Sequence, residues 1–342
     1  MNRLNRILAV ALVIQIVLAV IVFLPRILPA RAEGEPLFGA LDPAGVTRLS
    51  MSDRDGKGVE LAKQGDAWVV PSGGDYPADS SKISAFLEKV AAIKTNSLVT
   101  RTSSSHKRLQ VADDDFARRV ELTLGDGSRR TLLIGASASG GSHVRAAGSD
   151  EVYLARELFS YDAATDAVNW IDPVYFSFAQ DQASRLTLEN GNGALEFEKD
   201  ASGDWQMKGL KAGESFNADD FTSLLARIAS LRMTQPLGKD VKPEYGLDKP
   251  GATITIVAKD DAGNDKTYTL RVGAKETSGE GVAQTSSYAV LSSESPYVVR
   301  VGGFSLEDFV TRARQDFLNL PPAPTPAPEA TSTPEGTPTA TP

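Results

Sequence analysis

The feature that most constrains this chain is an internal repeat. Five stretches of the first half recur in the second half in the same order, four of them at an offset of 137 or 138 residues and the last at about 144. The matching pairs are 47–53 with 184–190, Trp68 with Trp205, the apolar positions of 83–93 with those of 221–231, 131–136 with 269–274, and 151–159 with 295–304. Such recurrence indicates two structural units that are built alike. We therefore expect tandem copies at about 42–175 and 180–318.

Both copies predict the same order of elements. Alternating apolar and polar residues predict antiparallel strands, which are joined by turns rich in Gly, Asp and Asn. The expected strands are 46–52, 59–63, 67–70, 119–124 and 130–134 in the first copy, and 185–189, 194–199, 204–208, 253–258 and 266–272 in the second. Apolar residues at i, i+3, i+4 and i+7 predict one amphipathic helix per copy, after the N-cap residues Asp79 and Asn217.

A last strand pair and a terminal helix are expected to close each copy. In the second copy, Ser305 with Asp308 resembles a capping box at the start of that helix. The expected fold class is therefore α+β, with an antiparallel sheet packed by an amphipathic helix in each of two tandem copies.

The first 32 residues predict a membrane anchor. The run Ile7–Leu24 carries no charge, and Gln15 is its only strongly polar residue. As a helix it would be roughly 27 Å long, close to the ~30 Å hydrocarbon core of a bilayer. A signal peptide cleaved near 30–32 is the alternative, although its apolar region would be shorter. We expect a single-pass cell-membrane protein, with one N-terminal transmembrane helix and the body on the extracytoplasmic side.

Charge and cysteine content exclude several classes of function. All 44 acidic residues but only 32 of the 36 basic residues follow residue 32, so the body carries a net charge of −12. Such a surface repels phosphate backbones, so we expect no nucleic acid partner. The chain has no cysteine, which excludes disulfides, thiolate metal sites and thiol nucleophiles. The stretch 320–342, rich in Pro and Thr, predicts a disordered tail.

No group of residues predicts catalysis, a metal site or a cofactor. The two histidines, His106 and His143, have no second histidine or carboxylate at ligand spacing. The glycine-rich loop after 134 lacks the pattern of a nucleophile elbow or of a phosphate-binding loop. The acidic clusters 113–115 and 260–265 lack the closing glutamate of a calcium loop, so we interpret them as solvated turns. An enzyme would require loops 101–118, 135–150 and 235–250 to converge into one polar cluster.

The tryptophans predict packing rather than ligand binding. Trp68 and Trp205 occupy matching strands beneath the predicted helices, where a large aromatic residue is typical of a core. Trp170 lies where the copies join and has no counterpart in the second copy. Together with Tyr175, Phe176 and Phe178 it is expected to wedge the two copies into one rigid unit.

The stretch YGLDKP, 245–250, connects these patterns to a known family. A hairpin, a tryptophan strand, an amphipathic helix, YGLDKP before a strand and the strand end T-L-x-[IV]-G together resemble the domain-of-unknown-function 4340 family. The residues that carry the resemblance are Tyr245, Gly246, Leu247, Asp248, Pro250, Trp68 and Trp205. The resemblance implies an N-terminal membrane segment, an exported body and, for some members, an auxiliary role beside ABC transporters of the gliding-motility type. It implies no catalytic residue.

In the first copy, the place of Tyr245–Asp248 is expected to be held by 107–110, with Leu109 as the only residue in common with the motif. We therefore interpret YGLDKP as a structural corner, with Gly246 for an unusual backbone angle and Pro250 to end the turn.

Two functions follow as hypotheses from different classes. The first is a non-enzymatic, membrane-anchored extracytoplasmic binding or scaffold protein, plausibly an auxiliary component of an ABC-type transport system, with a permease or envelope protein as its partner. The second is a cell-surface module that binds glycan or peptide in the groove between the two copies.

Overall fold

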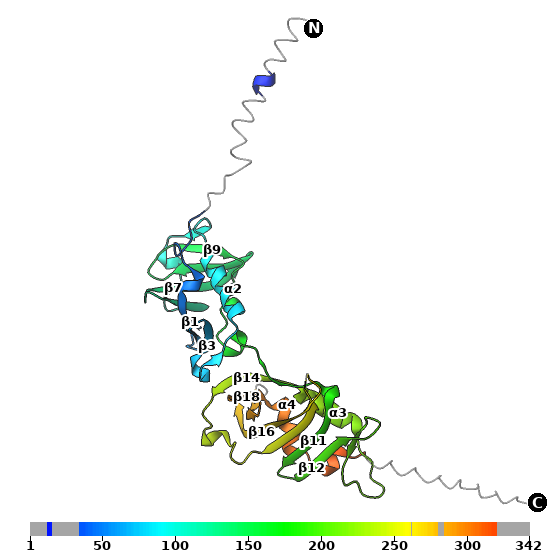
Figure 1. Cartoon of the computed structure of the whole chain (residues 1–342). Helices are drawn as coiled ribbons and strands as arrows, with labels where there is room; N and C mark the ends of the chain where they lie inside the picture. The colour runs from blue at the N-terminus through cyan, green and yellow to red at the C-terminus, as the bar shows by residue number, and fades with distance from the viewer. Residues whose placement is uncertain (1–11, 16–33, 261, 280–283, 320–342) are drawn as a thin grey trace, which may run out of the picture.

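The alternating segments of the two halves pair into two antiparallel sheets of nine strands each. The computed structural model describes residues 12–15, 34–260, 262–279 and 284–319. The two sheets form two lobes that follow one another along the chain (Figure 1). With two antiparallel sheets and few helices, the predicted α+β class is confirmed, and the chain is mostly β.

The first lobe contains one sheet and one helix. In chain order its elements are β1 (Val46–Ser52), β2 (Gly58–Gln64), β3 (Ala67–Val70), β4 (Tyr76–Pro77), α2 (Ser80–Ala91), β5 (Leu98–Thr100), β6 (Arg118–Leu124), β7 (Arg129–Ala138), β8 (Gly141–Ala146) and β9 (Val152–Arg156). In space the strands follow the order β4-β3-β2-β1-β6-β7-β8-β9-β5. The strand β5, which follows the helix, therefore lies at the far edge of the sheet.

The second lobe contains the second sheet and two helices. Its elements are β10 (Val174–Ser177), β11 (Ala183–Asn190), β12 (Gly193–Lys199), β13 (Trp205–Met207), α3 (Ala218–Ala229), β14 (Ser230–Gly238), β15 (Ala252–Lys259), β16 (Asp265–Ser278), β17 (Thr285–Ser292), β18 (Val298–Gly302) and α4 (Gly303–Thr311). The spatial order is β10-β14-β18-β17-β16-β15-β11-β12-β13. The strands predicted from alternation are present in both lobes, whereas β4, β5, β10 and β14 had no expected counterpart.

Eight strands of each sheet follow the same order. Read from β3 to β5, the first sheet runs β3-β2-β1-β6-β7-β8-β9-β5, and the second runs β13-β12-β11-β15-β16-β17-β18-β14. In both sheets the strand after the helix pairs with the last strand of the lobe, so the connections agree as well as the order. The strands β4 and β10 are the additions that distinguish the two sheets.

The strand registers agree between the two sheets as well. Trp68 faces Lys63 across the β2–β3 pair, and Trp205 faces Lys199 across the β12–β13 pair. The register of β7 with β8 shifts between 134 and 137, and that of β16 with β17 shifts between 272 and 275. A bulge adds one residue to one strand and locally redirects it, so a bulge at matching positions places the following residues alike.

The helices begin where their capping residues predict. The Asp79 side chain accepts hydrogen bonds from the backbone N–H groups of Ser81 and Lys82, at 3.0 and 3.3 Å. The Asn217 side chain accepts one from the N–H of Asp220 at 3.1 Å. Each bond satisfies an N–H that has no partner inside the helix. The buried faces of α2 and α3 consist of Ile83, Phe86, Leu87 and Val90, and of Phe221, Leu224, Leu225 and Ile228.

The capping box expected at Ser305 is wrong. The helix α4 begins at Gly303, directly after β18, so Ser305 lies within its first turn. A Cβ atom on Gly303 would overlap the hydroxyl of Ser286 on the neighbouring strand. Glycine at this position lets β18 and α4 pass close to Ser286 without a rearrangement of that side chain.

The four aromatic residues of the expected wedge belong to one apolar cluster but contact different elements. The Trp170 ring lies 5.5 Å from the ring of Phe86 on α2, and its Nε1–H donates to the carbonyl of Ala164 at 2.9 Å. Trp170 therefore belongs to the core of the first lobe. Phe176 lies 5.7 Å from Phe178 and 5.6 Å from Tyr268, inside the second lobe. Trp170 thus packs on α2 and Phe176 packs on β16, within one apolar cluster that is continuous through both lobes.

The lobes meet through close backbone contact rather than across an open groove. A Cβ atom on Gly74, which has a φ of +69°, would stand 2.6 Å from the Cα of Gly238 in β14. The ring of Tyr76 packs edge-on against that of Tyr297 at 4.7 Å, and the Tyr297 hydroxyl donates to the carbonyl of Asp75 at 2.9 Å. The joint therefore holds the first lobe against β14 and the β17–β18 turn of the second.

The hydroxyl of Tyr175 in β10 bonds the segment that connects the lobes to the second lobe. Its hydroxyl donates to the carbonyl of Tyr297 at 2.6 Å and accepts from the N–H of Ser292 at 2.9 Å. Burial raises the pKa of Tyr175 from 10.0 to about 12, because the charged phenolate is poorly solvated there. The neutral phenol is the form that the fold stabilises.

We expect Tyr175→Phe to lower the free energy of unfolding by about 1–3 kcal/mol at neutral pH, because the Ser292 N–H is left buried without a partner. The pKa of Tyr175 is higher in the folded protein than in the unfolded chain. Its contribution to the free energy of unfolding is therefore complete below about pH 10 and is lost as the pH rises through about 12. Denaturant unfolding of both proteins from pH 8 to 12 should show the difference between them shrinking. A difference that stays constant with pH would contradict this assignment.

The predicted membrane anchor lies almost entirely outside the described residues. Of the run Ile7–Leu24, the structure describes only residues 12–15, which are helical. Among the described residues, the helices are all too short or too polar to span a bilayer. The predicted disordered tail, 320–342, lies outside the described residues as well.

Candidate functional site

The family motif lies on the face of the second sheet that is turned away from the main core. Tyr245 ends a short 3-10 helix, Pro243–Tyr245, and Gly246 follows it with a φ of +63°. Tyr245 and Leu247 are buried in a small separate cluster with Ala289 of β17 and Val298 of β18. Side chains alternate between the two faces of a strand, and the neighbour of Ala289, Val290, belongs to the main core. The motif therefore closes the outer face of the sheet.

The corner rests on the glycine of the β16 bulge. A Cβ atom on Gly273 would overlap the carbonyl oxygen of Tyr245 and stand 3.1 Å from Cδ2 of Leu247. In the first lobe, a Cβ atom on Gly135 would overlap the carbonyl oxygen of Leu109 in the same way. In both lobes the bulge thus provides room for the backbone of an incoming loop.

The expected alignment of this corner in the first lobe is wrong by two residues. Gln110 has a φ of +55°, which matches the φ of +63° at Gly246. The residue whose carbonyl lies on the bulge glycine is therefore Leu109 in one lobe and Tyr245 in the other, and Val111 corresponds to Leu247. Matching by identity aligned the leucines, whereas the left-handed residue marks the true correspondence.

An arginine holds the corner in both lobes, but it comes from different strands. Arg145 of β8 donates from Nε to the carbonyl of Val111 at 2.6 Å. Arg271 of β16 donates from Nη1 to the carbonyl of Leu247 at 3.2 Å. Across the strand pairs, Arg145 faces a leucine of β7, and Arg271 faces a leucine of β17. Arginine and leucine therefore lie on opposite strands of the pair in the two lobes, while the bonded carbonyl is the equivalent one.

We expect Arg145→Met to destabilise the protein more than Arg271→Met. Arg145 is buried, and it also donates to the carbonyl of Ser149 at 3.0 Å and to the Asp113 carboxylate at 2.7 Å. Methionine leaves the buried carbonyl of Val111 unpaired, at a cost of about 1–3 kcal/mol. Replacing the half-buried Arg271 should cost less than about 1 kcal/mol, because this side chain makes a single, longer hydrogen bond to the carbonyl of Leu247. Thermal unfolding of the two variants compares their losses of stability. Equal losses would contradict the larger contribution that we assign to the hydrogen bonds of Arg145.

The other residues of the motif do not form a reactive group. Asp248 and Lys249 are exposed, and Pro250 precedes the first residue of β15. The tryptophans Trp68 and Trp205 are buried in the main core of their lobes. The motif and the tryptophans therefore lie apart, and no described contact joins them into one site.

The histidines also occupy separate positions. His106 is buried and bonds through Nε2 to the carbonyl of Asp150 at 3.0 Å. His143 bonds through Nδ1 to the carbonyl of Ala136 at 2.8 Å. Within the described ranges, no group of three or more His, Asp or Glu side chains lies close enough to hold a metal ion. Loop 235–250 forms the corner of the second lobe, away from loops 101–118 and 135–150 of the first.

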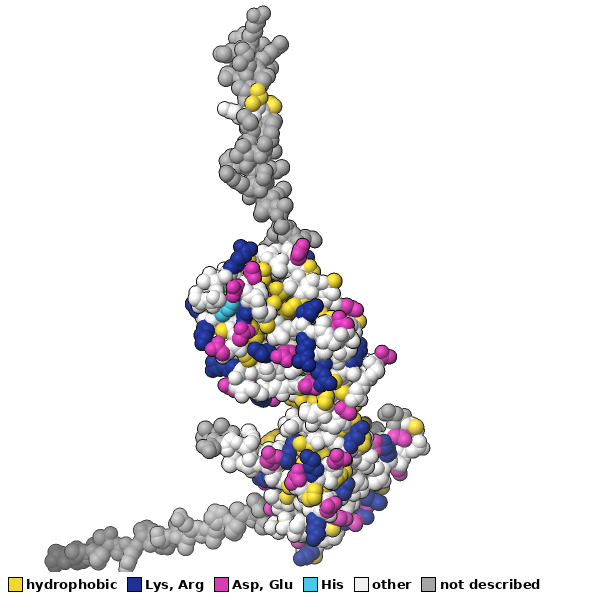
Figure 2. Space-filling model, turned by 90° about the vertical axis from the view of Figure 1, so that its left-hand side faces the viewer, with side chains coloured by type: hydrophobic (Ala, Val, Ile, Leu, Met, Phe, Trp, Pro, Cys, Tyr) yellow, Lys and Arg dark blue, Asp and Glu magenta, His cyan; other side chains and the backbone are white. Residues whose placement is uncertain are grey.

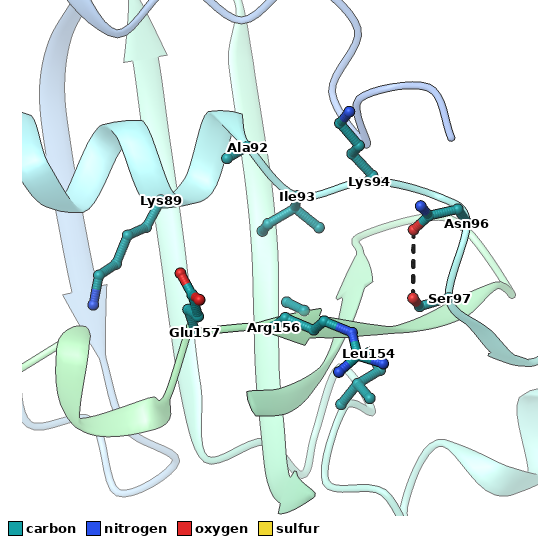
Figure 3. A pocket seen from close by; sticks show the side chains of 10 residues that line it. Lys89, Ala92, Ile93, Lys94, Asn96, Ser97, Leu154, Arg156 and Glu157 are labelled. Carbon is teal, nitrogen blue, oxygen red and sulfur yellow. Dashed lines mark hydrogen bonds between the residues drawn. The ribbon is translucent and has the colours of Figure 1, made fainter. Parts of the chain in front are cut away.

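A hollow of the first lobe lies between the end of α2, the segment 92–97 that leads to β5, and strand β9. Its volume is about 450 Å³. Figure 3 shows Arg156 and Glu157 on the β9 side, with Ile93 and Lys94 on the other. Glu157 has a φ of +61°, which is uncommon for a residue with a side chain. Lys94 and Arg156 have no carboxylate partner among the described residues.

A second hollow occupies the equivalent place in the second lobe. It has a volume of about 600 Å³, and it is lined by β14, β16, β17, β18 and the start of α4. Its wall contains serine and threonine hydroxyls and the ion pair of Arg300 with Glu276, whereas the wall of the first hollow contains Lys94, Arg156 and Glu157. The first hollow therefore carries two cations without a carboxylate partner among the described residues, Lys94 and Arg156, beside one carboxylate, Glu157, in a chain whose net charge is negative. Over the face shown in Figure 2, charges of both signs are interspersed.

The fold defines a class of protein with two β-rich α+β units in one chain. In each unit, an arginine bonds a corner loop to the outer face of the sheet. The chain belongs to the family described as domain of unknown function (DUF4340), whose model matches residues 68–250. That span begins in β3 and ends just before β15, so a single match crosses both lobes. No curated protein and no solved structure matches the chain.

Proposed function

We propose that this protein is a membrane-anchored extracytoplasmic scaffold or binding protein without enzymatic activity. Its body is a duplicated α+β domain, and its partner is a membrane or envelope protein, such as the permease of an ABC-type transport system. The transporter connection rests on what the resemblance to the family implies. The anchor rests on the uncharged run Ile7–Leu24.

The duplication is supported by strand order, register and bulges together. Eight strands share one order, and the bulges of β7 and β16 stand at matching positions. Both loops at these bulges carry a left-handed residue, and an arginine donates to the equivalent carbonyl. Agreement in strand order alone could arise from general folding rules. The shared bulges and latches are local details that those rules do not require.

The observation that carries the scaffold proposal is the joint between the lobes. Gly74 packs on Gly238, Tyr76 on Tyr297, and Tyr175 bonds to the turn that bears Tyr297. A joint of this kind keeps two lobes at a constant orientation, which a protein that holds partners in place requires. The chain enters the first lobe at the end away from the second lobe (Figure 1). In the proposed orientation the first lobe is therefore nearer to the membrane.

Affinity capture of the tagged full-length chain from detergent-solubilised membranes tests the proposal. We expect the chain in the carbonate-resistant membrane fraction, together with a membrane or envelope protein in constant proportion. A matched variant, Val13→Asp with Leu18→Asp, should leave that fraction, because each central carboxylate costs roughly 3 kcal/mol in a membrane helix. A wild-type chain found free in the medium, or captured without any envelope protein, would count against the proposal.

The alternative module was expected to bind glycan or peptide in a groove between the copies. At that place the backbones of 73–74 and 236–238 touch, and a Cβ atom on Gly73 would stand 2.7 Å from Cγ of Pro236. Two backbones in contact provide no room for a ligand. No observation among the described residues favours this alternative over the scaffold.

A further inference from the structure

Among the described residues, one edge of the first sheet has no neighbouring segment at the position where the second sheet is covered. In the first sheet, Leu98 faces Tyr153 and Thr100 faces Val152, with a register shift between them. In the second sheet, Pro236 faces Val299 and Gly238 faces Val298, again with a shift between them. The strand β5 is therefore equivalent to the last part of β14.

The last part of β14 is an interface within the chain. Pro236 and Gly238 are buried, because the 3-10 turn Pro71–Gly73 of the first lobe and Gly74 lie directly on them. The beginning of β14 is covered as well, since Val174 of β10 pairs with Arg232. Both parts of this edge are thus occupied by other segments of the same protein.

In the described part of the chain, the equivalent edge of the first sheet is occupied over only part of its length. Pro36 pairs with Lys94, as Val174 pairs with Arg232 in the second sheet. Beyond that point, β5 has β9 on one side and no strand on its outer side among the described residues. Leu98 and Val99 are 41% and 44% exposed. Consecutive exposed apolar residues on an unprotected edge are unusual, because such an edge readily pairs with another chain.

The charge beside this edge selects the kind of partner. The hollow next to β5 contains the cations Lys94 and Arg156, which have no carboxylate partner in the described part of the chain, and a single carboxylate, Glu157, so its charge is positive on balance. Arg101, just beyond β5, is 3.8 Å from Glu151 and remains exposed. A partner segment with carboxylates would be attracted here, whereas a second copy of this edge would bring like charges together.

We propose that the outer edge of β5, together with the hollow beside it, docks an extended apolar and acidic segment of a membrane protein partner. This proposal rests on the proposed function, since it names the surface that the partner uses. The segment adds to the sheet by backbone pairing, its apolar side chains cover Leu98 and Val99, and its carboxylates meet Lys94 and Arg156. The position of β5 in the lobe nearer to the membrane places it within reach of such a partner.

Site-specific photo-cross-linking of the full-length chain in its native membrane tests the surface. A photoreactive residue replaces Leu98, and the matched control carries it at Tyr161, which is 69% exposed on the same lobe. We expect a cross-link from position 98, and not from 161, to one membrane protein, within a segment that contains both apolar and acidic residues. A cross-link to a second copy of this chain, to lipid alone or equally from both positions would overturn the proposal, and so would no cross-link.

Charge reversal provides a second measurement. Lys94→Glu with Arg156→Glu should reduce the yield of the cross-link by about fivefold, whereas the exposed control pair Lys211→Glu with Lys249→Glu should leave it unchanged. Equal effects of the two pairs would contradict the acidic partner. If the chain is anchored and captures an envelope protein but position 98 gives no cross-link, the proposed docking surface is wrong and the proposed function is unaffected. If the chain is absent from membranes, the proposed function and this inference fail together.

Discussion

Replacing Gly273 by alanine should lower the free energy of unfolding by about 3 kcal/mol, because the new methyl group would overlap the carbonyl oxygen of Tyr245. The obstacle is backbone, so a change of rotamer cannot relieve it. Either the corner loop must leave the bulge, which exposes the buried side chains of Tyr245 and Leu247, or the strand must shift. Both outcomes disrupt the outer-face cluster of the second lobe.

The matched control is Gly302→Ala. A Cβ atom on Gly302 meets no atom within 4 Å, and its φ of −58° suits any residue. Alanine there should change the free energy of unfolding by less than about 0.5 kcal/mol. Urea unfolding of both variants gives the comparison. If Gly273→Ala is as stable as Gly302→Ala, the corner does not depend on the bulge.

Replacing Trp170 by alanine should cost about 4 kcal/mol, because it opens a cavity beneath α2 and removes a buried aromatic contact with Phe86. The backbone carbonyl of Trp170 also accepts from the N–H of Asp79, the N-cap of α2, at 2.7 Å. The loss should therefore be concentrated in the first lobe. Hydrogen exchange should show α2 losing more protection than α3.

The matched control for this variant is Tyr161→Ala, which removes an exposed aromatic residue from the same lobe. It should change the stability by about 0.5 kcal/mol or less. An equal loss of protection in α2 and α3 after Trp170→Ala would instead support a single wedge between the lobes, as the sequence predicts.

The strong local patterns predicted the central strands and both helix starts. Alternation at 46–52 and at 253–258 agrees with β1 and β15, and Asp79 and Asn217 cap the helices. These features depend on neighbouring residues, so the sequence contains them directly. The strand β14 was not predicted, because it contains Pro236 and proline is uncommon inside strands. Its register shifts at that residue, so the proline is tolerated.

At the corner, aligning the two lobes by identical residues gives the wrong correspondence. Leu109 and Leu247 share a residue type, yet the structure pairs Leu109 with Tyr245, because the left-handed residue is Gln110 in one lobe and Gly246 in the other. Glutamine at such a position gives no sequence signal, since few residues other than Gly, Asn and Asp favour it. The position of Arg145 and Arg271 on opposite strands of the pair could not be found by alignment either, because the two arginines do not occupy matching positions.

The sequence by itself determined the fold class, the central strands and the helix starts, because alternation and caps act over a few residues. The tertiary structure decided which edges are covered, which lobe Trp170 joins and where the arginine latch originates. Those properties depend on contacts between segments far apart in the chain, such as Gly74 with Gly238. The edge at Leu98, which has no outer neighbour among the described residues, belongs to this second kind, since only comparison with the covered edge at Pro236 distinguishes it from an ordinary surface strand.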